Sequence, residues 1–284
     1  IYLFYFEEIF PMSEILKAVL LGIVEGITEW LPVSSTGHLI LLNEFMPLNM
    51  SQAFINMFLV VIQLGAIMAV VVLYFKRLWP FGAGMSMLPE KKVLWYKILA
   101  ACMPAAVIGL LFDDYIEELF FNPWTVAIML ILFGIGFIVI ENHNKKVTPR
   151  VNSLEELTYK DALWIGMFQV IAAVFPGTSR SGSTILGGMV MGLRREVAAE
   201  FTFFLAVPVM FGASALKIAK YGLNFTGHEL AVMGAGLLSS FLVSIFAIKF
   251  LMTYIKKHDF KVFGWYRIVL GIVIILYFTM WKQV

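Results

Sequence analysis

Two carboxylates, three consecutive hydroxyl residues and one imidazole lie together in the segment EGITEWLPVSSTGH, residues 25–38 of an otherwise apolar stretch. Glu25 and Glu29 are four residues apart, so a helix places both on one face, about a turn apart. Two neighbouring carboxylates repel each other and need a proton, a cation or an arginine between them. The spacing therefore predicts either a structural pair solvated near an interface or a shared Mg²⁺ or Ca²⁺ ion, since both metals prefer carboxylate oxygens.

The hydroxyl groups of Ser34, Ser35 and Thr36 follow Pro32, where we expect a helix to break. A helix that restarts after this break turns its free N–H groups and positive dipole end toward the break, which favours an anion such as phosphate. We therefore expect Ser34 and Thr36 to bind substrate. His38 is placed to act as a general acid or base, or to attack phosphorus itself. Ser35 is the competing nucleophile, with His38 as its base, and the sequence leaves this choice open.

A second polar segment, PGTSRSG at 176–182, interrupts another apolar region. Its arginine, Arg180, is always charged and offers a planar fork that suits bidentate phosphate binding. The alternative is a structural ion pair with Glu25 or Glu29, and such a pair can also form in the empty site and yield to phosphate. Small hydroxyls at a helix break either bind phosphate or cap the backbone. The other candidate substrate-binding residues here are Thr178, Ser179 and Ser181.

The segments on either side of these residues are strongly apolar. The chain has 284 residues, of which 61% are hydrophobic and 14% charged, and its mean hydropathy is +0.87. A soluble domain averages about 45–50% apolar and about 25% charged residues. An excess of this size predicts an integral membrane protein. The formal net charge of +2, without a block of like charge, gives no sign of nucleic-acid binding.

Six apolar stretches approach the roughly 20 residues that a membrane-spanning helix needs. They cover residues 54–75, 93–112, 124–140, 197–216, 230–250 and 263–280. Two further apolar regions, 15–45 and 159–191, are interrupted by LPVSSTGH and FPGTSRSGS. Non-helical backbone at membrane depth is tolerated only where it is buried in protein or lines a wet cavity. We therefore predict an all-α fold of six transmembrane helices and two re-entrant helical hairpins.

The two broken regions match each other. GIVEGITEWLPVSSTG from residue 22 aligns with GMFQVIAAVFPGTSRSG from residue 166, which pairs Pro32 with Pro176 and Ser35 with Ser179 at a constant spacing of 144 residues. One residue is then inserted before the glycines that follow. Three spans come after each hairpin, and an odd number of crossings starts the second half on the opposite face of the membrane. The pattern predicts an inverted-topology repeat with a binding site where the two halves meet.

The repeat defines the expected domain organisation. We predict a single membrane domain over residues 12–284, with repeats at about 12–140 and 159–284 and a cytoplasmic linker at 141–158. Residues 1–11 are expected to be a non-native or disordered extension. Thirteen lysines and arginines fall on one face of this topology and four on the other, so the positive-inside rule makes the first face cytoplasmic. Both termini, an acidic loop DDYIEE at 113–118 and the opening of the site are then expected outside.

The two polar segments together resemble the signature segments of the bacterial undecaprenyl-diphosphate phosphatases of the bacitracin-resistance type. The likeness runs from about residue 12 to the C-terminus and includes VIQLG at 61–65. It implies hydrolysis of undecaprenyl diphosphate to undecaprenyl phosphate and inorganic phosphate, which recycles the lipid carrier of cell-wall synthesis in the bacterial cytoplasmic (inner) membrane. It also implies dependence on a divalent cation.

Carried over residue by residue, the resemblance assigns roles to five side chains of this sequence. Glu25 and Glu29 would bind the metal and transfer the proton, and Ser35 and His38 would carry out the attack on phosphorus. Arg180 would hold the diphosphate. The competing class is transport, because inverted repeats with broken helices are also typical of transporters, here of a polyprenyl phosphate or another anion. The expected partners are the prenyl diphosphate and membrane lipids, and the sequence leaves a homodimer open.

Overall fold

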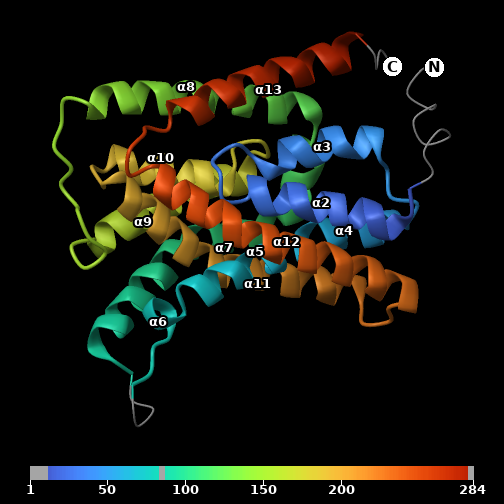
Figure 1. The fold of residues 1–284 in the computed structure, drawn as a ribbon, viewed down its shortest axis with the longest axis horizontal. Coiled ribbons are helices and arrows are strands. Elements are labelled where there is room, and N and C mark those ends of the chain that lie inside the picture. The colour runs from blue at the N-terminus through green and yellow to red at the C-terminus, as the bar shows by residue number, and fades with distance from the viewer. Residues whose placement is uncertain (1–11, 83–86, 281–284) are drawn as a thin grey trace.

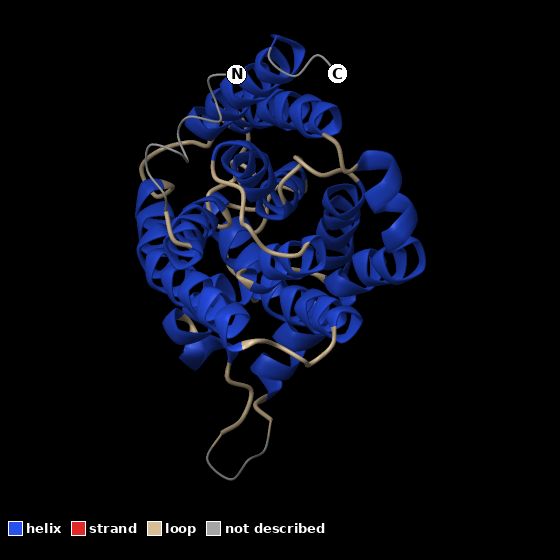
Figure 2. Cartoon of the chain, turned by 90° about the vertical axis from the view of Figure 1, so that its right-hand side faces the viewer, coloured by secondary structure: helices blue, strands red, loops and turns tan. Residues whose placement is uncertain are grey.

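The computed structural model describes residues 12–82 and 87–280, and over these residues the chain consists of helices joined by loops, with two isolated β-bridges (Figure 2). The helices are α2 (Glu14–Thr28), α3 (Ser35–Phe45), α4 (Gln52–Val61), α5 (Gln63–Leu73), α6 (Phe75–Leu78), α7 (Pro89–Phe120), α8 (Pro123–Asn144), α9 (Tyr159–Val174), α10 (Arg180–Val190), α11 (Arg195–Tyr221), α12 (Gly227–Tyr254) and α13 (Lys261–Met280). Residues 1–11, expected to be an extension, lie outside the described residues.

Six helical segments among the described residues are long and apolar enough to cross a membrane, as the sequence predicts. They are Gln52–Leu73, Pro89–Phe112, Pro123–Asn144, Arg195–Tyr221, Gly227–Tyr254 and Lys261–Met280. The first combines α4 and α5, which are separated only at Ile62. The prediction of a loop at 113–118 is wrong, because α7 continues to Phe120. This segment has neither glycine nor proline, and its glutamates favour helix, so nothing ends the helix there.

Each of the two broken regions forms a pair of shorter helices, α2 with α3 and α9 with α10 (Figure 1). These helices have 15, 11, 16 and 11 residues, fewer than the roughly 20 that a crossing needs. The backbone between them carries Pro32 in one region and Pro176 in the other. A proline has no N–H and its ring clashes with the preceding turn, so neither helix can run through its break.

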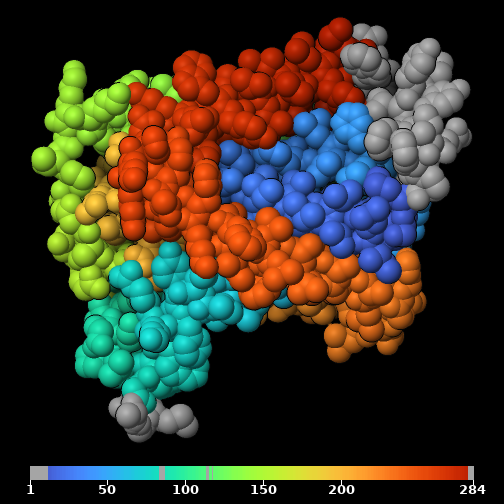
Figure 3. All heavy atoms as spheres, in the orientation of Figure 1, coloured from blue at the N-terminus to red at the C-terminus, as the bar shows by residue number. Residues whose placement is uncertain are grey.

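The first pair of helices is held between three long ones. α2 packs along α12 and α13 packs along α8, while α3 touches both α8 and α13 (Figure 1). Figure 3 shows the surface of α2 and α3 between α13 and α12. The contact of α2 with α12 requires glycine at Gly26, where a Cβ would lie 2.7 Å from the Ser240 carbonyl oxygen. Small residues of this kind let membrane helices approach closely, and here they bring the end of α2 into the protein interior.

Candidate active site

The two restarted helices begin with the same unusual cap. Ser34 precedes α3 and Ser179 precedes α10, with φ angles of 72° and 66°, and they are the only non-glycine residues with positive φ in the described chain. Their hydroxyls accept hydrogen bonds from the N–H groups of Gly37 (3.4 Å) and Gly182 (3.1 Å). A left-handed backbone costs a residue with a Cβ about 1–2 kcal/mol, and such strain is concentrated at functional sites. Both breaks therefore hold a costly and matching conformation.

The matching caps change the pairing that the sequence alignment gives. The structure pairs Ser34 with Ser179, and so places Ser35 opposite Arg180, whereas the ungapped alignment pairs Ser35 with Ser179. The inserted residue thus lies before the caps, in the backbone around Gly177, whose φ is +89°. The hydrogen bond of a capping serine fixes its position at the start of the helix. The shared caps therefore show which residues of the two breaks correspond more reliably than the match of identical residues in the alignment. Ser35 and Arg180 are consequently the first residues of the two restarted helices.

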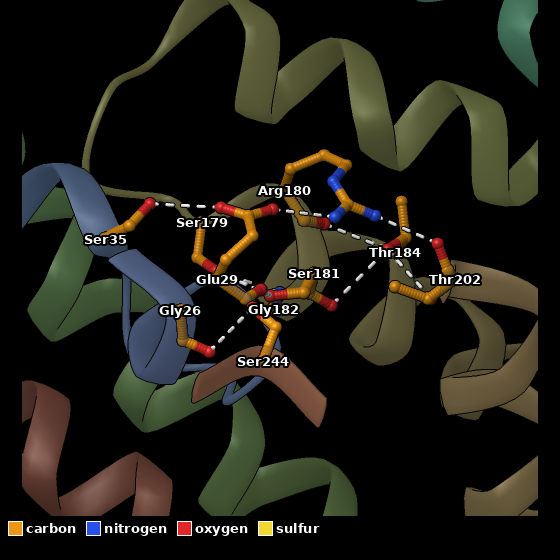
Figure 4. Close-up of polar contacts among 10 residues, drawn as sticks. All are labelled: Gly26, Glu29, Ser35, Ser179, Arg180, Ser181, Gly182, Thr184, Thr202 and Ser244. Carbon is orange, nitrogen blue, oxygen red and sulfur yellow. Dashed lines mark hydrogen bonds and ion pairs between the residues drawn. The ribbon is translucent and has the colours of Figure 1, made fainter. Parts of the chain in front are cut away.

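Glu29 joins these two helix starts (Figure 4). It follows the last residue of α2 and is 6% exposed. Its Oε2 accepts a hydrogen bond from the Ser35 hydroxyl at 3.1 Å, and its Oε1 lies 2.7 Å from Nη2 of Arg180. The Ser181 hydroxyl donates to the backbone oxygen of Glu29 at 2.8 Å. One carboxylate therefore connects the nucleophile candidate of the first break with the arginine of the second.

Arg180 makes further contacts besides its ion pair with Glu29. Its Nη1 donates to the carbonyl oxygen of Thr202 on α11 at 2.9 Å, and its guanidinium carbon lies 5.8 Å from the centroid of the Trp30 ring. The Thr184 hydroxyl donates to the Arg180 carbonyl oxygen at 2.9 Å, which fixes the first turn of α10. Of the two acidic partners that the sequence offered Arg180, the structure gives Glu29. A charged fork held by two hydrogen bonds is preorganised for a phosphate.

Glu25 is the residue whose surroundings best fit a metal ion. It is fully buried, and neither of its carboxylate oxygens has a hydrogen-bond partner in the protein. A buried carboxylate is costly unless something pairs with it. No group of three or more His, Cys, Asp or Glu side chains suited to a metal occurs among the described residues. Glu25 and Glu29 with substrate oxygens match the way Mg²⁺ is usually bound, by one or two carboxylates and phosphate groups.

His38 makes its hydrogen bonds away from Ser35. Its Nδ1 lies 2.7 Å from the Ser34 carbonyl oxygen, and its Nε2 lies 2.7 Å from the hydroxyl of Tyr266. The rings of His38 and Tyr266 are nearly parallel, 6° apart, with centroids separated by 5.6 Å. The Ser35 hydroxyl bonds Glu29 instead. The observed geometry thus offers Glu29, rather than His38, as the proton acceptor for Ser35.

The remaining predicted binding residues lie around these contacts. Thr36 is half-buried in the first turn of α3, and the Ser179 and Ser181 hydroxyls are 3.2 Å apart. Thr178 is buried, and its hydroxyl has no partner in the protein. Gln169 is also buried without a partner for its side-chain amide. Several polar atoms next to the breaks are therefore free to take a ligand.

Two residues of α13 complete the arrangement, and neither was singled out from the sequence. Tyr266 contacts His38, and Arg267 is fully buried between the breaks. Arg267 donates to the carbonyl oxygen of Pro32 (3.2 Å) in the first break and to those of Gly177 (3.0 Å) and Thr178 (2.6 Å) in the second. An arginine inside an apolar span is costly and is usually functional, and this was the available signal for Arg267. Nothing in the sequence pointed to Tyr266.

Comparison with known proteins gives a consistent result. A family model described as bacitracin resistance protein BacA matches residues 18–273. The chain is 64% identical over 270 residues to an undecaprenyl-diphosphatase of Desulfitobacterium hafniense, with 94% of this chain and 97% of the relative covered. It is 61% identical to undecaprenyl-diphosphatase 1 of Clostridium acetobutylicum, covering 93% and 97%. A relative from Acetivibrio thermocellus with the name undecaprenyl-diphosphatase is 58% identical, covering 94% and 98%.

Proposed function

The chain belongs to the bacitracin resistance protein BacA family, and from this premise we propose that the site between its two helix breaks hydrolyses undecaprenyl diphosphate. The activity is that of its relatives, which are 56–64% identical over most of the chain. The protein is thus a multi-pass membrane phosphatase that releases inorganic phosphate and undecaprenyl phosphate, as recycling of the cell-wall lipid carrier requires. The observation that carries the placement of the reaction is Glu29, which contacts both Ser35 and Arg180.

In the proposed reaction Ser35 attacks the terminal phosphorus of the substrate. As the Oγ–P bond forms, the Ser35 proton passes to the Glu29 carboxylate, to which the hydroxyl already donates. The bond between phosphorus and the bridging oxygen breaks, and that oxygen leaves with undecaprenyl phosphate. Water then attacks the phosphoserine, the Oγ–P bond breaks, inorganic phosphate leaves and Ser35 regains a proton.

The positive groups around the breaks stabilise the charge on the transferred phosphoryl group. Arg180 lies at the start of α10, and the free N–H groups of α3 and α10 lie just after the caps Ser34 and Ser179. Such preorganised donors supply most of the catalysis in phosphoryl transfer. The phosphate displaces Arg180 from part of its contact with Glu29, which frees the carboxylate to accept the proton. Ser34, Thr36, Thr178 and Ser179 supply further hydroxyls to the diphosphate, whereas the Ser181 hydroxyl is used by the Glu29 backbone oxygen.

A divalent cation, Mg²⁺ or Ca²⁺, is proposed to bind at Glu25 and Glu29. The two unpartnered oxygens of buried Glu25 support this assignment. When bound, the ion would neutralise negative charge on the diphosphate and orient its oxygens. The ion pair of Glu29 with Arg180 leaves Glu25 as the carboxylate with both oxygens available.

Removal of the metal is expected to abolish turnover. Purified protein in detergent is given a prenyl diphosphate, and phosphate release is measured with excess chelator and after addition of Mg²⁺ or Ca²⁺. We expect a loss of at least about 100-fold with chelator, because metal stabilisation of phosphoryl charge is worth several kcal/mol, and full recovery with metal. Undiminished release in chelator would refute the metal site. An absence of release with metal present would refute the assigned activity.

The transport alternative is not favoured by the contacts between the breaks. A transporter of alternating access moves one repeat against the other around a fixed site. Here Ser181 donates to the Glu29 backbone, and Arg267 donates to carbonyls of both breaks. Movement of one break against the other would rupture these buried hydrogen bonds. The arrangement suits a fixed catalytic site.

The two broken regions are proposed to be re-entrant hairpins that enter the membrane from opposite faces. Their helices are too short to cross it, and their matching caps at Ser34 and Ser179 support an inverted repeat. We also propose that the protein lies in the bacterial cytoplasmic (inner) membrane, with both termini and the mouth of the site outside. The excess of lysine and arginine on the opposite face supports this orientation.

Cysteine labelling tests the orientation, because Cys102 is the only cysteine in the chain. On a Cys102→Ser background, Asn224→Cys lies in the loop between α11 and α12, and Thr148→Cys lies in the linker between α8 and α9; both positions are exposed. In intact cells, an impermeant maleimide is expected to label Asn224→Cys and to reach Thr148→Cys only after permeabilisation. The reverse pattern would mean that the protein has the opposite orientation.

A further inference from the structure

Helix α13 brings a tyrosine hydroxyl to the histidine of the first break. Tyr266 and His38 are separated by 228 residues in sequence, and the Tyr266 Oη lies 2.7 Å from Nε2 of His38. Their rings stack at 5.6 Å. Tyr266 is 47% exposed, whereas the adjacent Arg267 is fully buried. The tyrosine ring therefore reaches the protein surface, and its hydroxyl is directed at a ring nitrogen of His38.

The other nitrogen of His38 fixes which atom carries the proton. Nδ1 lies 2.7 Å from the backbone carbonyl oxygen of Ser34, and a carbonyl oxygen can only accept a hydrogen bond. Nδ1 must therefore carry the hydrogen. In the neutral imidazole Nε2 is then the acceptor, and the Tyr266 hydroxyl donates to it. The two contacts together hold one tautomer and one ring orientation, as partners of a functional histidine commonly do.

We propose that Tyr266 is a positioning residue for His38, which it holds in one tautomer and one ring orientation. This inference rests on the proposed function for its effect on turnover, but the pairing itself does not depend on that function. During turnover, the water that attacks the phosphoserine would replace the Tyr266 hydroxyl at Nε2, where His38 can accept its proton; until then, Tyr266 keeps the ring from turning away. Ser34 contributes through its carbonyl, so the strained cap and the tyrosine act on the same ring.

The test is the substitution Tyr266→Phe, which removes the hydroxyl and keeps the stacked ring. We expect kcat for phosphate release to fall about tenfold, near the upper end of the worth of one hydrogen bond, with KM changed less than twofold. The matched control is Tyr159→Phe, since Tyr159 is 46% exposed and begins α9; it should leave both constants unchanged. In a His38→Ala background, Tyr266→Phe should have no further effect.

A spectroscopic measurement tests the pairing independently of turnover. The chain has four histidines, so ¹⁵N spectra of histidine-labelled protein in detergent are simple, and His38→Ala identifies the His38 signals. The wild type should show a protonated Nδ1 and a hydrogen-bonded Nε2, and Tyr266→Phe should shift the Nε2 signal alone. An unshifted signal would overturn the pairing. An equal loss of kcat with and without His38 would show that Tyr266 acts through another group, while inactive wild-type protein with the predicted spectrum would refute the proposed function alone.

Discussion

Glu29→Gln is expected to lower the rate of phosphate release by about 10²- to 10⁴-fold, the usual worth of a positioned general base. The amide keeps the size of the side chain but cannot take the Ser35 proton or pair as an anion with Arg180. The same substitution also weakens the proposed metal site. The measurement is phosphate release from a prenyl diphosphate by purified protein, at saturating substrate and metal.

The matched control for this prediction is Glu118→Gln, an exposed glutamate near the end of α7. It changes the net charge by the same amount and is expected to leave the rate within a factor of about two, as surface substitutions usually have small effects. A Glu29→Gln protein that folds and turns over at the wild-type rate would remove Glu29 from the reaction.

Arg267→Met is expected to destabilise the fold severely. Methionine fills part of the volume but leaves the carbonyls of Pro32, Gly177 and Thr178 buried without their donor. Each such loss costs about 1–3 kcal/mol, hence about 3–9 kcal/mol together, which is comparable to the whole stability of many proteins. Thermal unfolding in detergent, followed by size-exclusion chromatography after heating, measures the effect.

Two further variants sharpen the test of Arg267. Arg267→Lys keeps the charge but lacks the fork that reaches three carbonyls, so its melting temperature and activity are expected to lie between those of wild type and Arg267→Met. Arg194→Met is the matched control, because Arg194 is 54% exposed and is paired with its neighbour Glu196. It should melt close to wild type. Identical melting of wild type and Arg267→Met would show that the breaks do not depend on this arginine.

The sequence was sufficient to predict what depends on local composition. The six spans follow from the length of their apolar stretches, and the two breaks follow from Pro32 and Pro176. The polar segments around Glu29 and Arg180 could be identified because charged residues are costly in an apolar setting. Each of these features is decided by residues close together in the chain.

The features that the sequence did not predict depend on contacts between distant residues. His38 meets Tyr266 across 228 residues and Arg267 meets Pro32 across 235 residues. Neither contact can be inferred from the spacing of residues within one segment of the sequence. The predicted pairing of Ser35 with Ser179 is wrong by one residue, because Ser34 and Ser179 are the two residues that make the same capping hydrogen bond. The acidic run 113–118 looked like a loop by its charge alone, yet α7 extends through it.

A double-mutant cycle between Glu29 and Arg180 tests whether the two helix breaks form one active site. Glu29→Asp and Arg180→Lys keep both charges but move them, so activity should stay measurable. Residues that act as a unit give strongly non-additive effects. We predict that the loss of kcat/KM in the double variant is far smaller than the product of the two single losses. A double loss equal to that product, within about twofold, would contradict a shared site.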